Sequence, residues 1–193
     1  MKTICVFCGS NPGASSIYLK TAQKVGEFLA QNNIALVYGG GRVGLMGMVA
    51  DTVLANNGKV IGIIPEALAT REVAHGGLTE LHIVDSMHTR KAMMAELAEG
   101  FIALPGGFGT FEEFCEIITW AQLGIHEKPC ALLNVNGYYN SLEALFKHAT
   151  KEQFIRQEHR SLVLVDETIE MLYQKMKDFQ PPALEKWIDK SST

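Results

Sequence analysis

The chain has 193 residues, of which 47% are hydrophobic and 20% are charged, and its formal net charge is -4. These values suit one ordinary globular domain with a substantial core, and the negative charge argues against a nucleic-acid surface, which requires a basic footprint. No run of about 18 apolar residues and no signal-peptide pattern at the start MKTICVFCGS occurs, so we expect no membrane span and a cytoplasmic protein.

Apolar segments alternate with amphipathic ones along nearly the whole chain. Segments without polar alternation, typical of strands buried on both faces, lie at 3–8, 34–40, 59–65, 80–85, 100–107, 128–135 and 161–166. Segments with helical periodicity lie at 15–31, 44–57, 86–99, 110–123, 140–150 and 167–178. This order predicts an α/β domain with a Rossmann-like, doubly wound sheet, mostly or wholly parallel, of about seven strands flanked by helices. We expect a single domain over residues 1–180 and a C-terminal tail over residues 181–193.

The first predicted strand contains Cys5 and Cys8, which have C-x-x-C spacing. Residues three apart in a strand point to opposite faces, so these two thiols are not expected to share a metal ion or a disulfide. We expect them, Cys115 and Cys130 to be small core residues in a reducing compartment. The six histidines show no ligand-like spacing, so no metal site is predicted.

Glycine-rich segments follow three of the first five predicted strands: CGSNPGAS at 8–15, YGGGRVGLMG at 38–47 and PGGFGTFEE at 105–113. Segments that follow parallel strands converge at one edge of the sheet, where ligands bind. A phosphate needs backbone N–H groups at close range, and glycine removes the Cβ atoms that would obstruct it. We therefore interpret these segments as phosphate-binding loops, with candidate glycines Gly39, Gly40, Gly41, Gly44 and Gly106.

In the third glycine-rich segment, Gly107 and Gly109 clear the same approach, and Thr110 is expected to cap a helix that begins at about residue 110. The alternative is a tight strand-to-helix turn, which explains one or two glycines only. The lysine of a nucleotide-triphosphatase loop is missing. The spacing of Gly39, Gly41 and Gly44 leaves a dinucleotide site open, although the acid expected after the second strand is absent.

Two acids, Glu112 and Glu113, are expected in the first turn of that helix. Consecutive helical residues diverge by about 100 degrees, so only one of them can face the ligand edge. The alternative is that both merely interact with the helix dipole. A carboxylate beside an anion site makes sense if positive charge develops there during a reaction. Arg90 and Lys91, after the fourth strand, supply positive charge, unless Arg90 is a solvated helix residue.

PGGFGTFEE fits the P-G-G-x-G-T-x-x-E signature of the LOG ("lonely guy") family, the cytokinin riboside 5'-monophosphate phosphoribohydrolases. FCGSNPG, VYGGGRVGLMG, MHTRKAMM and ITWAQLGIHEKPCALLNVNGYYNSL also resemble that family in order and spacing, so the resemblance covers roughly residues 3–165. Members often carry the label lysine decarboxylase. A pyridoxal enzyme needs a Schiff-base lysine, and no lysine lies in the glycine-rich loops.

The resemblance implies hydrolysis of the N-glycosidic bond of a cytokinin nucleoside 5'-monophosphate or AMP, releasing an adenine-type base and ribose 5-phosphate. It implies a homodimer with active sites near the subunit interface and no cofactor. It assigns Arg90 and Glu113 as the catalytic pair. The substrate contacts it implies are Glu72, Arg90, Lys91, Gly107, Phe108, Gly109, Thr110, Phe111, Glu112 and Thr119.

Within this reading, Glu113 would stabilise an oxocarbenium-like sugar. Arg90 would neutralise the phosphate or stabilise the departing base, and Glu72 would hold the base or a ribose hydroxyl. Three alternative functions stay open: a non-catalytic nucleotide-binding module, a nicotinamide dehydrogenase and a decarboxylase. The choice between AMP and a cytokinin nucleotide, and between a dimer and a larger assembly, also stays open.

Overall fold

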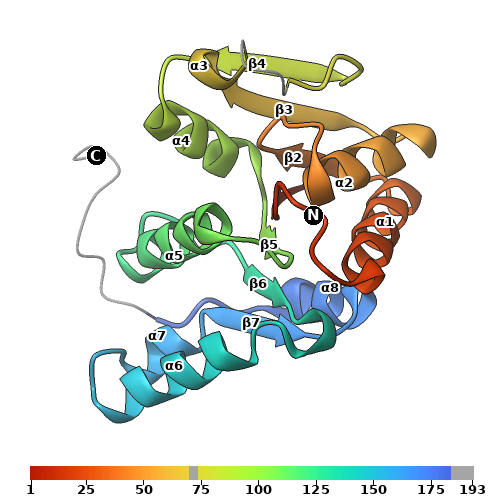
Figure 1. Ribbon diagram of the computed structural model, residues 1–193. Helices are drawn as coiled ribbons and strands as arrows, with labels where there is room; N and C mark the ends of the chain where they lie inside the picture. Colours follow the sequence, from red (N-terminus) through yellow and green to blue (C-terminus); the bar gives the residue numbers. More distant parts are fainter. Residues whose placement is uncertain (70–73, 184–193) are drawn as a thin grey trace.

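The computed structural model describes residues 1–69 and 74–183 (Figure 1). Over these residues seven strands form one sheet in the order β4-β3-β2-β1-β5-β6-β7, and every neighbouring pair is parallel. The strands are β1 (Thr3–Phe7), β2 (Ala35–Tyr38), β3 (Val60–Pro65), β4 (Glu80–Val84), β5 (Phe101–Ala103), β6 (Cys130–Leu133) and β7 (Val163–Asp166). The prediction of a parallel, doubly wound α/β sheet is confirmed.

The long helices lie where the periodicity places them. They are α1 (Ser16–Gln31), α2 (Gly44–Ala55), α4 (Met87–Leu97), α5 (Phe108–Gln122), α6 (Asn140–Lys151) and α8 (Ile169–Asp178). Three short elements were not predicted: α3 (Glu66–Leu68), η2 (Val135–Gly137) and α7 (Gln157–Arg160). Each is about one turn long, which is too short for an apolar period to show in the sequence. Of the predicted tail, residues 181–183 are described.

Two hydrophobic cores lie on the two faces of the sheet. One contains buried residues of α1, α2 and α8, and the other contains buried residues of α4 and α5. Successive strand residues contribute to opposite cores: Leu36 belongs to the first and Val37 to the second, and both are fully buried. This double coverage is the physical reason why the strands read as continuous apolar runs.

The cysteines test this arrangement. Cys5 lies in the α4–α5 core and Cys8 in the α1–α2 core, as the strand geometry predicted. Cys130 is also buried, but Cys115 is exposed, so the prediction that all four are core residues is wrong. Phe114 and Ile117 lie on the buried face of α5. Cys115 lies outside that face and is therefore exposed.

The strands β1 and β5 lie side by side at the switch point, where the direction in which strands are added to the sheet reverses. From β1 the chain continues to β2 on one side, and from β5 it continues to β6 on the other. The loops after these two strands therefore diverge, which is where α/β proteins open a ligand crevice. The Gly9 N–H group donates to the Pro105 carbonyl at 3.1 Å and joins the two loops at their base.

The start of α5 differs from the prediction. The helix begins at Phe108, its N-cap is Gly107, and no side chain caps it. Thr110 is therefore not the cap; it is buried within the first turn. Glu112 and Glu113 consequently lie in the second turn rather than the first. The first N–H groups of α5 are therefore left without a side-chain partner.

Candidate active site

Arg90 of α4 and Glu113 of α5 face each other at the carboxyl edge of the sheet. Arg90 Nη2 lies 3.6 Å from Glu113 Oε1, and each side chain is only 11% exposed. The helix α4 precedes β5 and α5 follows it, and both pack against the same face of the sheet. The fold thus brings together the two residues that the family resemblance pairs.

Arg90 is held in place by the backbone around β2 and β3. Its Nε–H group donates to the Ile63 carbonyl at 3.2 Å. A Cβ atom at Gly39 would lie 1.8 Å from Arg90 Nη2. Gly39 therefore makes room for the guanidinium, and a direct contact of Gly39 with phosphate stays a prediction.

Burial raises the pKa of the Glu113 carboxyl above its ordinary value, while the charge of Arg90 opposes the rise. A buried carboxylate without a cation would simply take up a proton. The pair with Arg90 keeps the charged form accessible in a site from which most water is excluded. Such a carboxylate can accept a proton or stabilise positive charge that develops beside it.

Lys91 and Glu112 form a second contact between the same two helices. The Lys91 ammonium group donates to Glu112 and, at 3.0 Å, to Glu116. Burial lowers the pKa of Lys91, but the hydrogen bonds to the two glutamates outweigh it and raise the pKa overall. The Glu112 side chain is 53% exposed, against 11% for Glu113. Lys91 and Glu112 therefore tie α4 to α5, while their neighbours Arg90 and Glu113 turn inward.

The glycines after β5 have two different environments. A Cβ atom at Gly106 would lie 2.1 Å from Thr110 Oγ1 and 2.9 Å from the Gly9 nitrogen. Added Cβ atoms at Gly107 and Gly109 would meet no atom within 4 Å. Gly106 is thus required for packing, whereas Gly107 and Gly109 border open space at the N-terminus of α5, where helix N–H groups lack partners.

The glycines after β2 allow backbone conformations and close packing that other residues would obstruct. Gly40 and Gly44 have positive φ angles of 74° and 58°. A Cβ atom at Gly44 would lie 2.3 Å from the Ser10 carbonyl carbon, so glycine lets α2 start against the loop that follows β1. Gly41 forms an antiparallel bridge with Ala74.

A cavity of about 180 Å³ lies at the switch point between the loops after β1 and β5. Backbone-rich segments form most of its wall, and two tyrosines complete it. The lining residues are Gly9, Ser10, Asn11, Pro12, Gly13, Tyr18, Leu45, Pro105, Gly106, Gly107 and Tyr138. Its position next to the start of α5 is suited to an anionic group.

Some predicted contact residues lie away from the Arg90–Glu113 pair. The Thr119 hydroxyl donates to the Cys115 carbonyl at 2.7 Å on the outer side of α5. Phe108 is 92% exposed at the start of that helix. The Phe111 ring lies beside those of Tyr138 and Tyr139. Glu72 lies outside the described residues.

Two residues that contact the glycine loop were not among the predicted site residues. The Tyr138 hydroxyl donates to the Gly106 carbonyl at 2.5 Å, and the Tyr139 hydroxyl donates to the Leu104 carbonyl at 2.6 Å. The segment GYYN belongs to the motifs that resemble the family, but its residue types alone indicate no chemistry. Only the fold brings this turn after β6 against the loop after β5.

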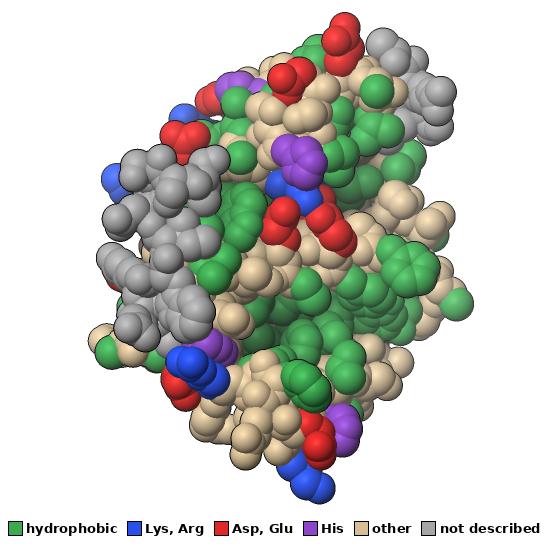
Figure 2. All heavy atoms as spheres, turned by 90° about the vertical axis from the view of Figure 1, so that its left-hand side faces the viewer, with side chains coloured by type: hydrophobic (Ala, Val, Ile, Leu, Met, Phe, Trp, Pro, Cys, Tyr) green, Lys and Arg blue, Asp and Glu red, His purple; other side chains and the backbone are tan. Residues whose placement is uncertain are grey.

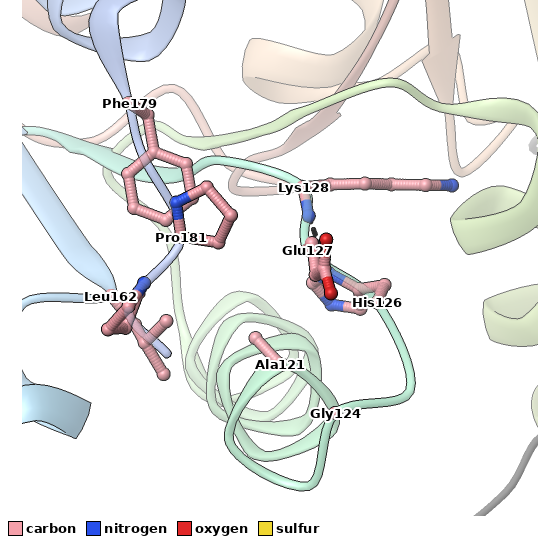
Figure 3. A pocket seen from close by; sticks show the side chains of 9 residues that line it. Ala121, Gly124, His126, Glu127, Lys128, Leu162, Phe179 and Pro181 are labelled. Carbon is pink, nitrogen blue, oxygen red and sulfur yellow. Dashed lines mark hydrogen bonds between the residues drawn. The ribbon is translucent and has the colours of Figure 1, made fainter. Parts of the chain in front are cut away.

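Two other hollows are lined by residues outside the loops that follow β1 and β5. A small pocket of about 30 Å³ lies between the end of α5 and the segment around Phe179 and Pro181 (Figure 3). It has room for only one or two water molecules. A groove of about 570 Å³ lies between α4 and α5, lined by residues that include His88, Glu116 and Trp120.

Over residues 1–69 and 74–183, no group of three or more His, Cys, Asp or Glu side chains is placed to hold a metal ion. In the same part of the chain, no helix combines the length and the apolar character needed to cross a bilayer.

These features define a Rossmann-like α/β protein with a glycine-rich sheet edge beside a buried arginine–glutamate pair. The family model described as "Possible lysine decarboxylase" matches residues 46–176. The chain is 52% identical over 170 residues to the cytokinin riboside 5'-monophosphate phosphoribohydrolase of Rhodococcoides fascians, covering 88% of this chain and 86% of that protein. It is 48% identical over 180 residues to the enzyme of that name, LOG3, from Arabidopsis thaliana, covering 93% and 84%. The chain therefore belongs to the LOG family, as the motifs indicated.

Solved structures with low identity share the fold alone. The molybdenum cofactor binding protein of Rippkaea orientalis aligns with a TM-score of 0.69 at 21% identity, over 92% of this chain and 97% of that one. The molybdenum cofactor carrier protein of Chlamydomonas reinhardtii aligns with a TM-score of 0.68 at 18% identity, over 91% and 96%.

Proposed function

We propose that this protein hydrolyses the N-glycosidic bond of nucleoside 5'-monophosphates that carry an adenine-type base. The products are the free base and ribose 5-phosphate. The observation that carries the proposal is the Arg90–Glu113 pair, buried next to the open glycines of α5. The names of the LOG relatives support the same reaction. A purely binding module would have no use for a buried carboxylate at an anion edge, where like charges repel.

In this mechanism the Glu113 carboxylate lies beside the ribose. Cleavage of an N-glycosidic bond builds positive charge on the sugar, as in glycoside hydrolysis. The carboxylate stabilises that charge and orients or deprotonates the attacking water. Because burial raises the pKa of Glu113, its charged form is lost at a higher pH than for an exposed glutamate, so activity declines as the pH falls through that raised pKa.

The 5'-phosphate is held at the glycine-rich edge. The N–H groups at the start of α5 and the open space at Gly107 and Gly109 support this placement. The phosphate anchors the far end of the substrate and positions the sugar for attack. We assign Arg90 chiefly to Glu113, since its charge is what lowers the pKa of that carboxyl against the effect of burial.

Lys91 argues against a decarboxylase. A Schiff-base lysine must lose its proton to attack a carbonyl group. Lys91 instead donates to two glutamates, and its pKa is raised. It is therefore held as an ammonium group.

We further propose that the protein acts in the cytoplasm as a homodimer whose interface includes the face of α4 and α5. Figure 2 shows hydrophobic side chains on this side of the molecule, around a group of acidic and basic ones. Met87 is 41% exposed there, and Trp120 lines the groove between the two helices. Exposed apolar surface of this kind is typical of protein interfaces.

The reaction is tested by product analysis with AMP, isopentenyladenosine monophosphate, adenosine and lysine. We expect free base and ribose 5-phosphate from at least one monophosphate. Adenosine should react with a kcat/KM at least about tenfold to a hundredfold lower, because it loses charge-assisted hydrogen bonds of about 1.5–3 kcal/mol each. Cleavage of adenosine as efficient as that of AMP would contradict the phosphate site, and decarboxylation of lysine would contradict the proposal.

Gly107→Val tests the same site from the protein side. No protein atom lies within 4 Å of an added Cβ atom, so the variant should fold normally while its side chain occupies the place of the phosphate. We expect kcat/KM for the monophosphate to fall toward the value for adenosine. Gly76→Val is the matched control, because Gly76 also borders open space but belongs to the segment between α3 and β4 rather than to the loop before α5. Equal kinetics of the two variants would exclude this role of Gly107.

Glu113→Gln and Glu112→Gln separate the two acids. Glu113→Gln keeps the shape of the side chain but removes its charge, so we expect kcat to fall about 100-fold or more, the scale of a general acid–base contribution. Nucleotide binding, measured by calorimetry, should persist. Glu112→Gln should have a much smaller effect, since that side chain pairs with Lys91 and is half exposed. Similar losses in both variants would show that the assignment of roles is wrong.

Sedimentation velocity at micromolar protein tests the assembly. We expect a dimer, which Trp120→Glu should weaken by placing a charge in the α4–α5 groove. Leu145→Glu is the control, because Leu145 is an exposed apolar residue of α6. A wild-type monomer with full activity would refute the dimer.

A further inference from the structure

Two consecutive tyrosines hold the loop between β5 and α5. The turn after β6 places them: the Asn134 side chain accepts from the Tyr139 N–H group at 2.7 Å and donates to Asn140 at 2.8 Å. The Tyr138 hydroxyl then donates to the Gly106 carbonyl at 2.5 Å, and the Tyr139 hydroxyl donates to the Leu104 carbonyl at 2.6 Å. The two bonds have the same chemistry and lie two residues apart on one loop.

The two carbonyls differ in what lies on the other side of their peptide bonds. In a trans peptide the C=O and N–H groups point in opposite directions. The Gly106 carbonyl shares its peptide with the Gly107 N–H group, so the bond to Tyr138 directs that N–H away from the tyrosine. The Leu104 carbonyl shares its peptide with Pro105, which has no N–H group. The Tyr139 bond therefore directs no donor.

Gly107 is the N-cap of α5, and the first bond of this helix runs from the Phe111 N–H group to the Gly107 carbonyl. The N–H groups of residues 107–110 are the four that a helix leaves unpaired at its start. In the described part of the chain, the Gly107 N–H group makes no hydrogen bond. Without a fixed peptide, the first donor of this set is free to turn, because glycine on both sides allows many backbone angles.

We propose that Tyr138 is a positioning residue for the 5'-phosphate of the substrate: its hydroxyl fixes the Gly106–Gly107 peptide so that the Gly107 N–H group joins the donors at the start of α5. This inference rests on the proposed function and deepens it, since it assigns the phosphate site a residue that acts through a backbone N–H group. Tyr139 holds the same loop but contributes only to stability.

The ring of Tyr138 is anchored independently of its hydroxyl. It packs edge-on against Tyr18 and Tyr139, with centroid separations of 6.0 and 5.1 Å, and lies alongside Phe111 at 6.4 Å. Tyr138→Phe therefore removes the hydroxyl and keeps these ring contacts. Tyr139→Phe is the matched control, because it removes a hydroxyl bond of the same kind from the same loop.

The experiment compares wild type, Tyr138→Phe and Tyr139→Phe by KM and kcat for the monophosphate, by kcat/KM for the nucleoside, by Tm, and by calorimetric binding of ribose 5-phosphate. For Tyr138→Phe we expect KM and the Kd of ribose 5-phosphate to rise about tenfold, the value of one charge-assisted hydrogen bond, with the nucleoside unaffected. Tyr139 is 1% exposed. For Tyr139→Phe we therefore expect a lower Tm and an unchanged KM.

An unchanged KM and Kd in Tyr138→Phe, or an equal rise in Tyr139→Phe, would overturn the positioning role. The binding measurement separates this outcome from failure of the proposed function. If the wild type cleaves no monophosphate but binds ribose 5-phosphate about tenfold more tightly than Tyr138→Phe does, the reaction is wrong and the positioning role stands. If the wild type binds no ribose 5-phosphate, both fail.

Discussion

A carboxylate buried at the edge of a parallel sheet is the constraint on which the site depends. An unpaired buried charge costs several kcal/mol or is lost to a proton, so Glu113 requires Arg90 beside it. Arg90 in turn requires the missing Cβ atom of Gly39 and the Ile63 carbonyl, which accepts from its Nε–H group. One ion pair thus links the ends of β2 and β3 to α4 and α5. The outer contact of Lys91 with Glu112 keeps the two helices at the distance that this pair needs.

The glycines of the glycine-rich loops fall into two groups, according to what an added Cβ atom would meet. Gly39, Gly44 and Gly106 leave room for other parts of the protein: a guanidinium, the loop after β1, and a threonine hydroxyl. Gly107 and Gly109 leave room for a ligand, since nothing in the described chain occupies it. A glycine motif is therefore not a single phosphate cradle. Part of it makes room for the Arg90–Glu113 pair, and part of it leaves the N-terminus of α5 open to the anion that we propose binds there.

Much of the fold was predictable because each strand is covered on both faces and each long helix repeats an apolar stripe. The edge that carries the site followed from the parallel topology. Features set by tertiary contacts were not predictable. The exposure of Cys115 depends on which side of α5 meets the sheet. The start of that helix at Phe108 depends on the close packing of Gly106 against Thr110 and Gly9. Tyr138 acts on a loop 32 residues away in the sequence, and no local pattern marks such a contact.

The proposed reaction builds positive charge on the ribose beside Glu113. The secondary isotope effect of deuterium at the sugar carbon C1' measures that charge, because the carbon becomes planar as the base departs. It is measured on kcat/KM of the wild type, in which the Glu113 carboxylate is present. We expect the unlabelled monophosphate to react measurably faster than the deuterated one. Equal rates for the two substrates would contradict a cationic sugar and, with it, the role given to the buried pair.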